Sequence, residues 1–494
     1  MNRTQIVVLL GVIGGGMLLN GGLSTPGYAQ ETPQLAPLNP AFVEYLKSPR
    51  RMIMDEEGHA LGYIPSPLLP EIHVPDKRQA SPSDPKYDLR DPNGDGNQND
   101  SLLSPIRDQG SCGTCWAFAN YGSLESHLKK FGLDSNPDFS EDNLKHRHGF
   151  DLGPCSGGYT QMTVVYLARS DGPISESDDP YDPSPTSTFC TTCTPVRYID
   201  NILYLPVRSS VTDNAYIKSA LLTYGALSSA FYWESASYNA SNYTYYYNGP
   251  EGSNHAIVIV GWDDTKLTVA PTPGAFIIRN SWGTGWGEAG YFYIAYADTK
   301  LAFGELAAFD EKADASLAFQ KIYMYDPLGN TGAVSYGSNI VWGANWFTPT
   351  QDGILTAVGL SVGASNMAYE IRIYDTKTDS STSSSFSDQL GATQTGTVTY
   401  AGYHTIKLNQ PVALHAGNGF AVAIKFTAPP ANTWPLSLEF PVGDASAATA
   451  HAGESYMSPD GASWTDLTAN PDFANTNVCI KAFVDAARYL LWTK

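Results

Sequence analysis

The hydrophobic pattern changes character twice along the chain, and this constrains the fold more than any other feature. Apolar side chains recur at helical spacing over residues 115–131 and 159–169, whereas short β-type runs follow Tyr198. From about Ile322 the runs are alternating or β-branched, and Gly, Asn, Asp and Pro separate them. We therefore predict an α+β domain followed by an antiparallel β-sandwich domain.

The same pattern locates individual elements. The first helix is expected to end at Gly132, with Lys129 and Lys130 in its last turn. Residues 375–391, which are dense in Ser and Thr, are predicted to form a long polar loop. Strands are predicted over residues 226–233, 255–261, 275–279 and 290–296, and in the second domain over residues 354–362, 369–374, 404–408, 419–426 and 478–484.

The charge balance excludes one class of partner. The 494 residues include 29 Lys and Arg against 49 Asp and Glu, which gives a formal net charge of −20. An acidic chain repels a phosphate backbone, so we expect no nucleic acid partner. The length favours two domains plus extensions over a single core.

The first residues have the features of a signal peptide, residues 1–29. Arg3 supplies a positive charge, an apolar stretch covers residues 6–19, and small residues precede a cleavage position after Ala29. This stretch is shorter than the roughly 20 residues of a membrane span, and no Cys follows it to carry a lipid. We expect a secreted protein, extracellular or periplasmic, without a membrane anchor. Residues 30–85, rich in Pro and charge, would form an N-terminal extension or prosegment.

Cys115 is the strongest candidate for a nucleophile. Only the thiolate attacks a carbonyl, and a free Cys with a pKa of about 8.5 is mostly protonated at neutral pH. Cys115 lies at the start of the predicted helix, where unpaired N–H groups and the helix dipole favour a negative charge. An imidazole nearby can pair with the thiolate and later protonate the leaving amine. Of nine histidines, only His255 opens a strongly apolar β-run, which would hold its ring rigidly.

Three further side chains complete this candidate site. Asn280 follows another apolar strand and can accept a hydrogen bond from the His255 ring, while Trp282 can shield that bond from water. Gln109 lies six residues before Cys115 and can point its amide into the site. Together with the backbone N–H of Cys115, this amide would form an oxyanion hole.

These stretches resemble the papain family of cysteine peptidases. The Cys motif C-G-[SA]-C-[WY] appears at residues 112–116, with Thr114 in the third place. His255 and Asn280 follow Cys115 in the order of the family and at roughly its spacing. The resemblance covers about residues 86–310 and also includes the helix entry at residues 140–144, the glycine segment at residues 155–159 and a turn at residues 178–181.

The resemblance implies a fold, a reaction and the roles of further residues. A papain-like domain over residues 86–312, with a helical half, a β half and the cleft between them, would hydrolyse peptide bonds through a thioester acyl-enzyme without cofactor or metal. Cys112 would pair with Cys155 and leave Cys115 free. Gly158 would bind an extended peptide by strand addition, and its lack of a side chain would admit the substrate. The other residues expected to bind substrate are Gly157, Tyr159, Asn254 and Trp282, with Thr160 and Ala256 bordering a specificity pocket whose floor the sequence does not locate.

The chain departs from the family pattern in two places. Cys190 and Cys193 stand close together where the family has a more distant bridge. A local disulfide is favoured over zinc, which needs further ligands, and over a redox pair, which needs a βαβ context. Residues 30–85 lack a long helical prosegment, so it stays open whether they inhibit the enzyme and whether maturation occurs near Tyr87.

Residues 320–487 resemble the lectin-like domain that follows papain-type peptidases in some microbial secreted proteins. The resemblance rests on residues 325–329, 346–347 and 453–458. By analogy we expect binding of a glycan or a surface, because exposed aromatic rings stack on sugars; for any single ring, packing in the sandwich core is the stronger interpretation. Cys479, on the last strand, is expected to be a buried unpaired thiol.

Other interpretations stay open at this point. A disulfide between Cys115 and Cys112 would leave Cys155 unpaired and would not explain the other candidate residues. A secreted adhesin with an inactive papain-like domain would not need four intact catalytic positions, and an acyl transferase would use the same Cys–His pair. Residues 91–100 follow the first half of a calcium loop, but Leu102 stands where a bidentate Glu is required, so a solvated turn is favoured.

Overall fold

A computed structural model describes residues 32–47, 53–70, 82–311, 319–430 and 434–486. The predicted signal peptide lies outside these residues. Within the described ranges, no helix is both long enough and apolar enough to cross a membrane.

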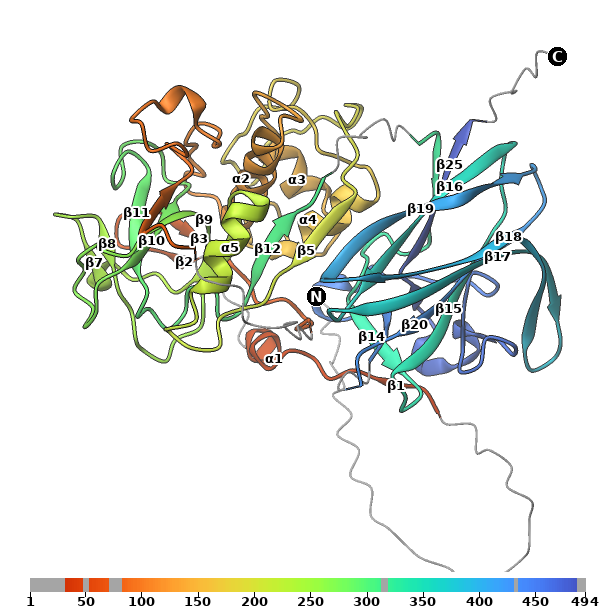
Figure 1. Cartoon of the computed structure of the whole chain (residues 1–494). Helices are drawn as coiled ribbons and strands as arrows, with labels where there is room; N and C mark the ends of the chain where they lie inside the picture. The colour runs from red at the N-terminus through yellow and green to blue at the C-terminus, as the bar shows by residue number, and fades with distance from the viewer. Residues whose placement is uncertain (1–31, 48–52, 71–81, 312–318, 431–433, 487–494) are drawn as a thin grey trace, which may run out of the picture. The chain divides into compact units, whose positions relative to one another are not determined.

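The helices of the first domain surround the long helix α2. Every residue of α2 (Cys115–Lys130) from Cys115 to Leu128 is buried. The helix packs against α3 (Glu141–Arg147), α4 (Thr160–Ala168) and the strands β6 (Leu227–Phe231), β9 (His255–Asp263) and β12 (Leu306–Phe309) (Figure 1). A helix covered on all sides needs no polar face, which explains its run of Ala, Phe, Tyr and Leu. Both predicted helices are confirmed. The helices are α2 (Cys115–Lys130), α3 (Glu141–Arg147), α4 (Thr160–Ala168) and α5 (Ala215–Tyr224).

The strands of this domain form a mostly antiparallel sheet that includes all four predicted strands. The pairing order runs β5, β12, β6, β9, β10, β11, β8, β7, and β4 adds to β9. Helix α5 interrupts this β-rich region; Ile217, Ala220 and Leu221 are buried at helical spacing on one face, a pattern too short to predict from sequence. The strands are β4 (Lys86–Asp88), β5 (Asn201–Tyr204), β6 (Leu227–Phe231), β7 (Tyr238–Asn239), β8 (Thr244–Tyr245), β9 (His255–Asp263), β10 (Ala275–Arg279), β11 (Tyr291–Ala295) and β12 (Leu306–Phe309).

The second domain is the predicted antiparallel sandwich. In β15, Val341 and Phe347 join the main sandwich core, whereas Trp342 and Trp346 on the alternate face join a smaller aromatic cluster. The strands are β13 (Lys321–Tyr323), β14 (Gly332–Ser335), β15 (Ile340–Phe347), β16 (Gly353–Val362), β17 (Met367–Asp379), β18 (Ser384–Val398), β19 (Ala401–Leu414), β20 (Phe420–Thr427), β21 (Leu436–Glu439), β22 (Ser455–Ser458), β23 (Thr465–Asp466), β24 (Asn477–Val478) and β25 (Ile480–Ala486).

The prediction of a polar loop over residues 375–391 is wrong. Strands β17 and β18 pair from Met367↔Val398 to Asp379↔Ser384, so this stretch forms a hairpin with a turn at residues 380–383. Its Ser and Thr side chains are mostly exposed, which removes the apolar alternation that marks a half-buried strand. Backbone pairing, rather than side-chain burial, holds this ribbon.

One sheet continues from the first domain into the second. Strand β19 pairs antiparallel with β5, with Ala401 opposite Tyr204, and β16 and β25 extend the sheet beyond β19. Close to this junction, the hydroxyls of Tyr198 and Tyr403 lie 2.7 Å apart.

The N-terminal extension packs on both domains. Strand β1 (Gln34–Leu35) pairs with β14, and helix α1 (Pro40–Lys47) follows it. Phe42 of α1 is fully buried and contacts Gly443 of the sandwich. Two short paired strands, β2 (Ile53–Met54) and β3 (Ala60–Leu61), then lead into the cleft of the first domain. The buried side chains of the extension therefore pack into the hydrophobic cores of the two domains.

Candidate active site

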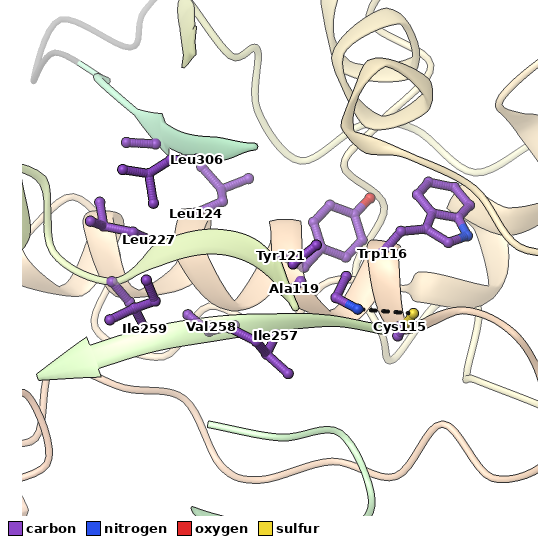
Figure 2. Close-up of a cluster of buried hydrophobic side chains, with 14 of the residues drawn as sticks. Cys115, Trp116, Ala119, Tyr121, Leu124, Leu227, Ile257, Val258, Ile259 and Leu306 are labelled. Carbon is purple, nitrogen blue, oxygen red and sulfur yellow. Dashed lines mark hydrogen bonds between the residues drawn. The ribbon is translucent and has the colours of Figure 1, made fainter. Parts of the chain in front are cut away.

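The folded chain brings the start of α2 against the start of β9. The backbone N–H of Ala256 donates to Cys115 Sγ at 3.4 Å, and Cys115 is completely buried. Figure 2 shows this contact as a dashed line, with Cys115 at the start of α2 and the apolar side chains Ile257, Val258 and Ile259 following along β9. The apolar strand that made His255 a candidate therefore places that residue next to the thiol.

His255 and Asn280 form the predicted hydrogen bond. The atoms His255 Nε2 and Asn280 Oδ1 lie 2.9 Å apart, and Asn280 Oδ1 also accepts from the backbone N–H of Ser281 at 2.9 Å. Because Asn280 Oδ1 is an acceptor, Nε2 of His255 carries the hydrogen. His255 Nδ1 is then the unprotonated nitrogen; it is buried and has no hydrogen-bond partner among the described residues. This is the ring nitrogen that can accept a proton.

Trp282 covers the His255–Asn280 pair as expected. Its ring stacks on the His255 imidazole with centroids 4.7 Å apart and planes 24° apart. On Trp282 a second imidazole, that of His59 in the N-terminal extension, stacks at 4.3 Å and 10°. The indole is therefore in contact with both histidines, and water has no access to the bond between His255 and Asn280.

Burial keeps both reacting groups neutral in this state. It raises the pKa of the Cys115 thiol to about 11. Four backbone N–H groups oppose this by lowering the pKa: those of Ala256, Gly62, Trp116 and Cys115 itself. Burial also lowers the pKa of His255 to about 4, although the hydrogen bond to Asn280 opposes this shift. A thiol and a neutral imidazole are therefore the favoured forms at neutral pH.

Gln109, the proposed oxyanion donor, has both ends of its amide hydrogen-bonded. It is fully buried, and its Oε1 accepts from the Ser281 hydroxyl at 2.6 Å, which orients the amide. Its Nε2 donates to the carbonyl oxygens of Ala60 and Cys112, both at 2.9 Å. The carbonyl oxygen of Ala60, in the segment that occupies the cleft, thus already accepts a hydrogen bond from Gln109.

Residues 59–64 of the N-terminal extension fill the cleft. Tyr63 N–H donates to Asn254 O at 3.1 Å, Ile64 N–H donates to Gly158 O at 2.9 Å, and Gly158 N–H donates to Gly62 O at 2.8 Å. These bonds form a parallel bridge between Tyr63 and Gly158. Two predicted substrate-binding residues, Asn254 and Gly158, therefore hold an extended backbone in this structure.

Glycines allow the two backbones to approach closely. A Cβ on Gly62 would lie 2.1 Å from Gly113 O, and a Cβ on Gly157, whose φ is +96°, would lie 2.8 Å from Gly62 O. A Cβ on Gly158 would instead lie 2.6 Å from the Trp116 ring. The missing side chain at Gly158 thus serves packing against Trp116, and Gly157 is the residue that admits the neighbouring chain.

The remaining predicted residues divide between the site and the core. Tyr159 packs its ring against Phe150 and is buried, so its side chain belongs to the core. Disulfides join Cys112 to Cys155 and Cys190 to Cys193, whereas Cys115 and Cys479 are free and buried. A bridge between Cys115 and Cys112 is therefore excluded.

The acidic loop at residues 91–100 folds on itself. Asp91 Oδ1 accepts from Asp95 N–H at 3.1 Å and Asp91 Oδ2 accepts from Gly96 N–H at 3.0 Å, which is a turn stabilised by its own backbone. Carboxylate oxygens of Asp91, Asp95 and Asp100 lie within 4.8 Å of one another on an exposed loop. These turn contacts agree with the favoured interpretation of a solvated turn.

The sequence interpretation missed His59 and Gly62 in the cleft. Residues 59–63 read His-Ala-Leu-Gly-Tyr, a small and apolar run inside a segment rich in Pro and charge. This contrast in composition is the one sequence signal for the segment, and it does not indicate where the segment binds.

Two family models match the chain, one in each domain. Residues 86–307 match the papain family cysteine protease model and residues 322–484 match the lectin like domain model. The gamete and mating-type specific protein A of Dictyostelium discoideum is 33% identical over 207 residues, which are 41% of this chain and 42% of that protein. Mouse pro-cathepsin H is 27% identical over 208 residues, 40% of this chain and 59% of that protein. The chain thus covers about half the length of these relatives.

Solved structures match over most of the chain. The cysteine protease and lectin-like domains of Cwp84, a surface layer associated protein of Clostridium difficile, align with a TM-score of 0.75 and 23% identity, covering 92% of this chain and 98% of that one. The clostridial cysteine protease Cwp84 after propeptide cleavage aligns with a TM-score of 0.66 and 25% identity, covering 78% and 97%. The papain-like fold followed by a lectin-like sandwich is therefore shared.

Proposed function

We propose that this chain, which carries a papain-family cysteine protease domain at residues 86–307 and a lectin-like domain at residues 322–484, is a secreted peptidase that residues 59–64 keep latent. One observation carries the proposal. Cys115, His255 and Asn280 come from distant parts of the chain. The fold brings Cys115 Sγ within 3.4 Å of the backbone nitrogen of Ala256, the residue after His255, and joins His255 to Asn280 by the 2.9 Å imidazole–amide bond.

Hydrolysis follows from the roles that this geometry supports. His255 Nδ1 takes the Cys115 proton, and the thiolate attacks the carbonyl carbon of a peptide bond. The negative oxygen of the tetrahedral intermediate accepts hydrogen bonds from Gln109 Nε2 and the Cys115 backbone N–H. The C–N bond then breaks, and the imidazolium returns its proton to the leaving amine. Water, deprotonated by His255, cleaves the remaining thioester and restores the thiol.

The N-terminal extension acts as a prosegment in this proposal. The backbone N–H of Gly62 is among the groups that lower the pKa of the Cys115 thiol, so this segment lies close to Sγ. Residues 59–64 thus occupy the part of the cleft that a substrate would need. The structural relative described after propeptide cleavage supports removal of this segment as the activating step.

A paired substitution tests the nucleophile. The chain without residues 1–29, with a protease recognition sequence inserted within residues 71–81, is assayed on fluorogenic peptides before and after cutting. We expect activity after cutting and release of the segment, and its loss in Cys115→Ala. Cys479→Ala is the matched control, because this second buried thiol lies in the sandwich. Peptidase activity that persists in Cys115→Ala, or that never appears after release, would contradict the proposal.

For the lectin-like domain we propose binding of a glycan or a surface. Trp346 on the outer face of β15 is only half-buried, stacks on Phe386 with planes 6° apart, and has Lys377 Nζ 5.5 Å from its ring centroid. Phe347 and Tyr456 are buried in packing clusters and offer no such surface. Retention on polysaccharide columns that Trp346→Ala abolishes would support the proposal, and unchanged retention would remove Trp346 from it. The alternative of an inactive adhesin is not favoured, because the site retains all four catalytic positions.

A further inference from the structure

The loop at residues 109–114 carries both donors of the proposed oxyanion hole. Gln109 at its start supplies the side-chain amide, and its end leads into Cys115, which supplies the backbone N–H. Gly110, with a φ of +57°, and Gly113 lie between the two donors, so the loop has much backbone freedom of its own. The distance between the donors therefore depends on contacts that hold the loop from outside.

One phenol hydroxyl contacts both ends of this loop. Tyr181 Oη lies 2.9 Å from Gln109 O and 2.7 Å from Thr114 Oγ1. A carbonyl oxygen can only accept, so Tyr181 donates its hydrogen to Gln109 O and Thr114 donates to Tyr181 Oη. Thr114 is fully buried and directly precedes Cys115. The Tyr181 hydroxyl thus joins the backbone of the first donor to the residue before the second donor.

Tyr181 is itself held in place by the surrounding helices. Its ring packs edge to face on Phe118 of α2, with the ring centroids 4.9 Å apart. Lys145 Nζ of α3 lies 4.9 Å from the centroid of the Tyr181 ring and 2.7 Å from Asp142 Oδ1, and it donates to Asp182 O. Lys145 is fully buried, and a buried ammonium is costly unless it is paired in this way. The turn that carries Tyr181 is therefore fixed to helix α3.

The hydroxyl remains a hydrogen-bond donor in the released enzyme. Burial raises the pKa of the Tyr181 phenol, with the hydrogen bond from Thr114 as an opposing influence. The phenol therefore stays protonated near neutral pH. The bonds to Gln109 and Thr114 join residues of the peptidase domain alone, so release of residues 59–64 should leave them in place.

The contact depends on a residue at which this chain departs from the family motif. The third position of the Cys motif is Ser or Ala in the family and is Thr114 here. Ala has no hydroxyl, and Ser rotates more freely about χ1, whereas the branched Cβ of Thr restricts that rotation. Thr114 is therefore well suited to hold its hydroxyl toward Tyr181.

We propose that Tyr181 is a positioning residue for the oxyanion hole, because its hydroxyl fixes the spacing between the Gln109 amide and the Cys115 N–H. The inference rests on the proposed peptidase function and adds a residue that acts through the loop rather than on the substrate. Oxyanion donors act only within about 2.7–3.1 Å of the developing negative oxygen. A small shift of the loop therefore weakens them more in the transition state than in the bound substrate, so loss of the hydroxyl should lower kcat more than it raises KM.

Tyr181→Phe tests the inference on the released protein with fluorogenic peptides. We expect kcat/KM to fall about 10- to 30-fold, mainly through kcat. Alkylation of Cys115 by iodoacetamide forms no oxyanion, so its rate should stay within about twofold of the wild-type rate. Tyr296→Phe is the control: its hydroxyl donates to Asp264 Oδ1 at 2.6 Å, at the end of the β10–β11 pair opposite to Asn280, so both rates should be unchanged.

Substitutions at Thr114 test the other half of the contact. Thr114→Val keeps the branched shape without the hydroxyl and should lower kcat/KM to the level of Tyr181→Phe. The double variant should lose little more than either single variant, since both break the same hydrogen bond. Thr114→Ser keeps a hydroxyl and should retain at least about half of the wild-type kcat/KM. Additive losses, or a Thr114→Ser protein as impaired as Thr114→Val, would overturn the inference.

Hydrogen exchange gives a readout that needs no substrate. Backbone amides in residues 109–115 should exchange faster in Tyr181→Phe than in the wild type, and at the wild-type rate in Tyr296→Phe. Unchanged exchange, unchanged kcat/KM, or an equal loss of peptide cleavage and alkylation in Tyr181→Phe would overturn the inference. A released wild type that cleaves no peptide would instead contradict the proposed function, while faster exchange in Tyr181→Phe would still support the role of this residue in holding the loop.

Discussion

The candidate active site of the first domain and the network around Asn477 in the sandwich both bury polar side chains, but they differ in whether the buried atoms find partners. In the first domain His255 Nδ1, Asn280 Nδ2 and Trp282 Nε1 are buried without a hydrogen-bond partner among the described residues. In the sandwich, Asn477 Nδ2 donates to Tyr325 O, Thr449 O and Glu439 Oε2. A buried polar residue therefore does not by itself indicate function.

In these two places, the unpaired atoms belong to residues of the proposed site and the paired atoms to residues that hold the fold together. Unsatisfied buried groups are destabilising, so a fold keeps them where another requirement demands it. Asn477 holds two backbone carbonyls and the Glu439 carboxylate, and Asn345 Nδ2 likewise bridges the carbonyl oxygens of Val478 and Ile480. The site atoms instead face the reacting groups and the chain in the cleft. We expect substitutions in the site to lower peptidase activity and substitutions in the network around Asn477 to lower stability.

His255→Ala should have the largest effect, mainly on activity. Loss of the proton acceptor should lower kcat/KM of the released protein by about 10³-fold or more. Tm should fall less in His255→Ala than in Asn477→Ala, because the substitution also removes the buried Nδ1, which has no hydrogen-bond partner among the described residues. Kinetics on fluorogenic peptides with parallel calorimetry check both. A fully active His255→Ala protein would remove this residue from the site.

Asn477→Ala should have the opposite profile. Three buried acceptors would lose their donor, which should lower the free energy of unfolding by about 2–4 kcal/mol. The folded fraction should keep its peptidase activity. Asn409→Ala, at an exposed position of β19, is the control and should change stability by less than about 0.5 kcal/mol. Equal effects of the two substitutions would show that the network around Asn477 is not a stabilising feature.

Gly62→Val should weaken latency in the uncut chain. The added Cβ would meet Gly113 O at 2.1 Å, and a backbone atom cannot move aside as a flexible side chain does. Residues 59–64 should leave the cleft more often, so uncut protein should gain about 10- to 100-fold in peptidase rate. Gly252→Ala, whose Cβ meets no atom within 4 Å, should leave the uncut chain latent. An uncut Gly62→Val protein that stays silent while its cut form is active would contradict docking by close backbone approach.

Asn280→Ala should have the smallest of these effects. It removes the acceptor that keeps the hydrogen on His255 Nε2, so the ring loses its tautomer preference rather than its function. We expect kcat/KM to fall by about 10- to 100-fold with little change in KM. A shift of the acidic limb of the pH–rate profile should accompany the loss. An unchanged profile would mean that Asn280 serves packing.

The sequence predicts those parts of the fold that have a local pattern. Helix α2 and strands β9 and β10 appear at the predicted places because each buries a continuous apolar run. These elements carry Cys115 and His255 and lead to Asn280, so the core of the site follows from the same signal. The resemblance to the papain family adds the disulfide between Cys112 and Cys155, which the structure contains.

The parts that the sequence does not predict depend on contacts between distant backbones. The β17–β18 hairpin is held by ladder hydrogen bonds between polar strands, and polar strands have no apolar alternation. The docking of residues 59–64 depends on backbone bonds to Gly158 and Asn254, which any sequence of suitable size can make. The pairing of Glu305 with Thr160 joins residues 145 positions apart. Such features arise from tertiary packing.

The reactivity of Cys115 tests the central claim most directly. Intact protein and protein cut and freed of its N-terminal segment are alkylated with iodoacetamide from pH 5 to 9, and labelling of Cys115 is followed by mass spectrometry. Burial raises the pKa of Cys115 in the intact chain, so labelling should be slow and should increase only toward alkaline pH. Release should expose an ion pair with His255 and give fast labelling already below pH 7. Equal rates in the two forms, or fast labelling of the intact chain, would contradict latency through residues 59–64.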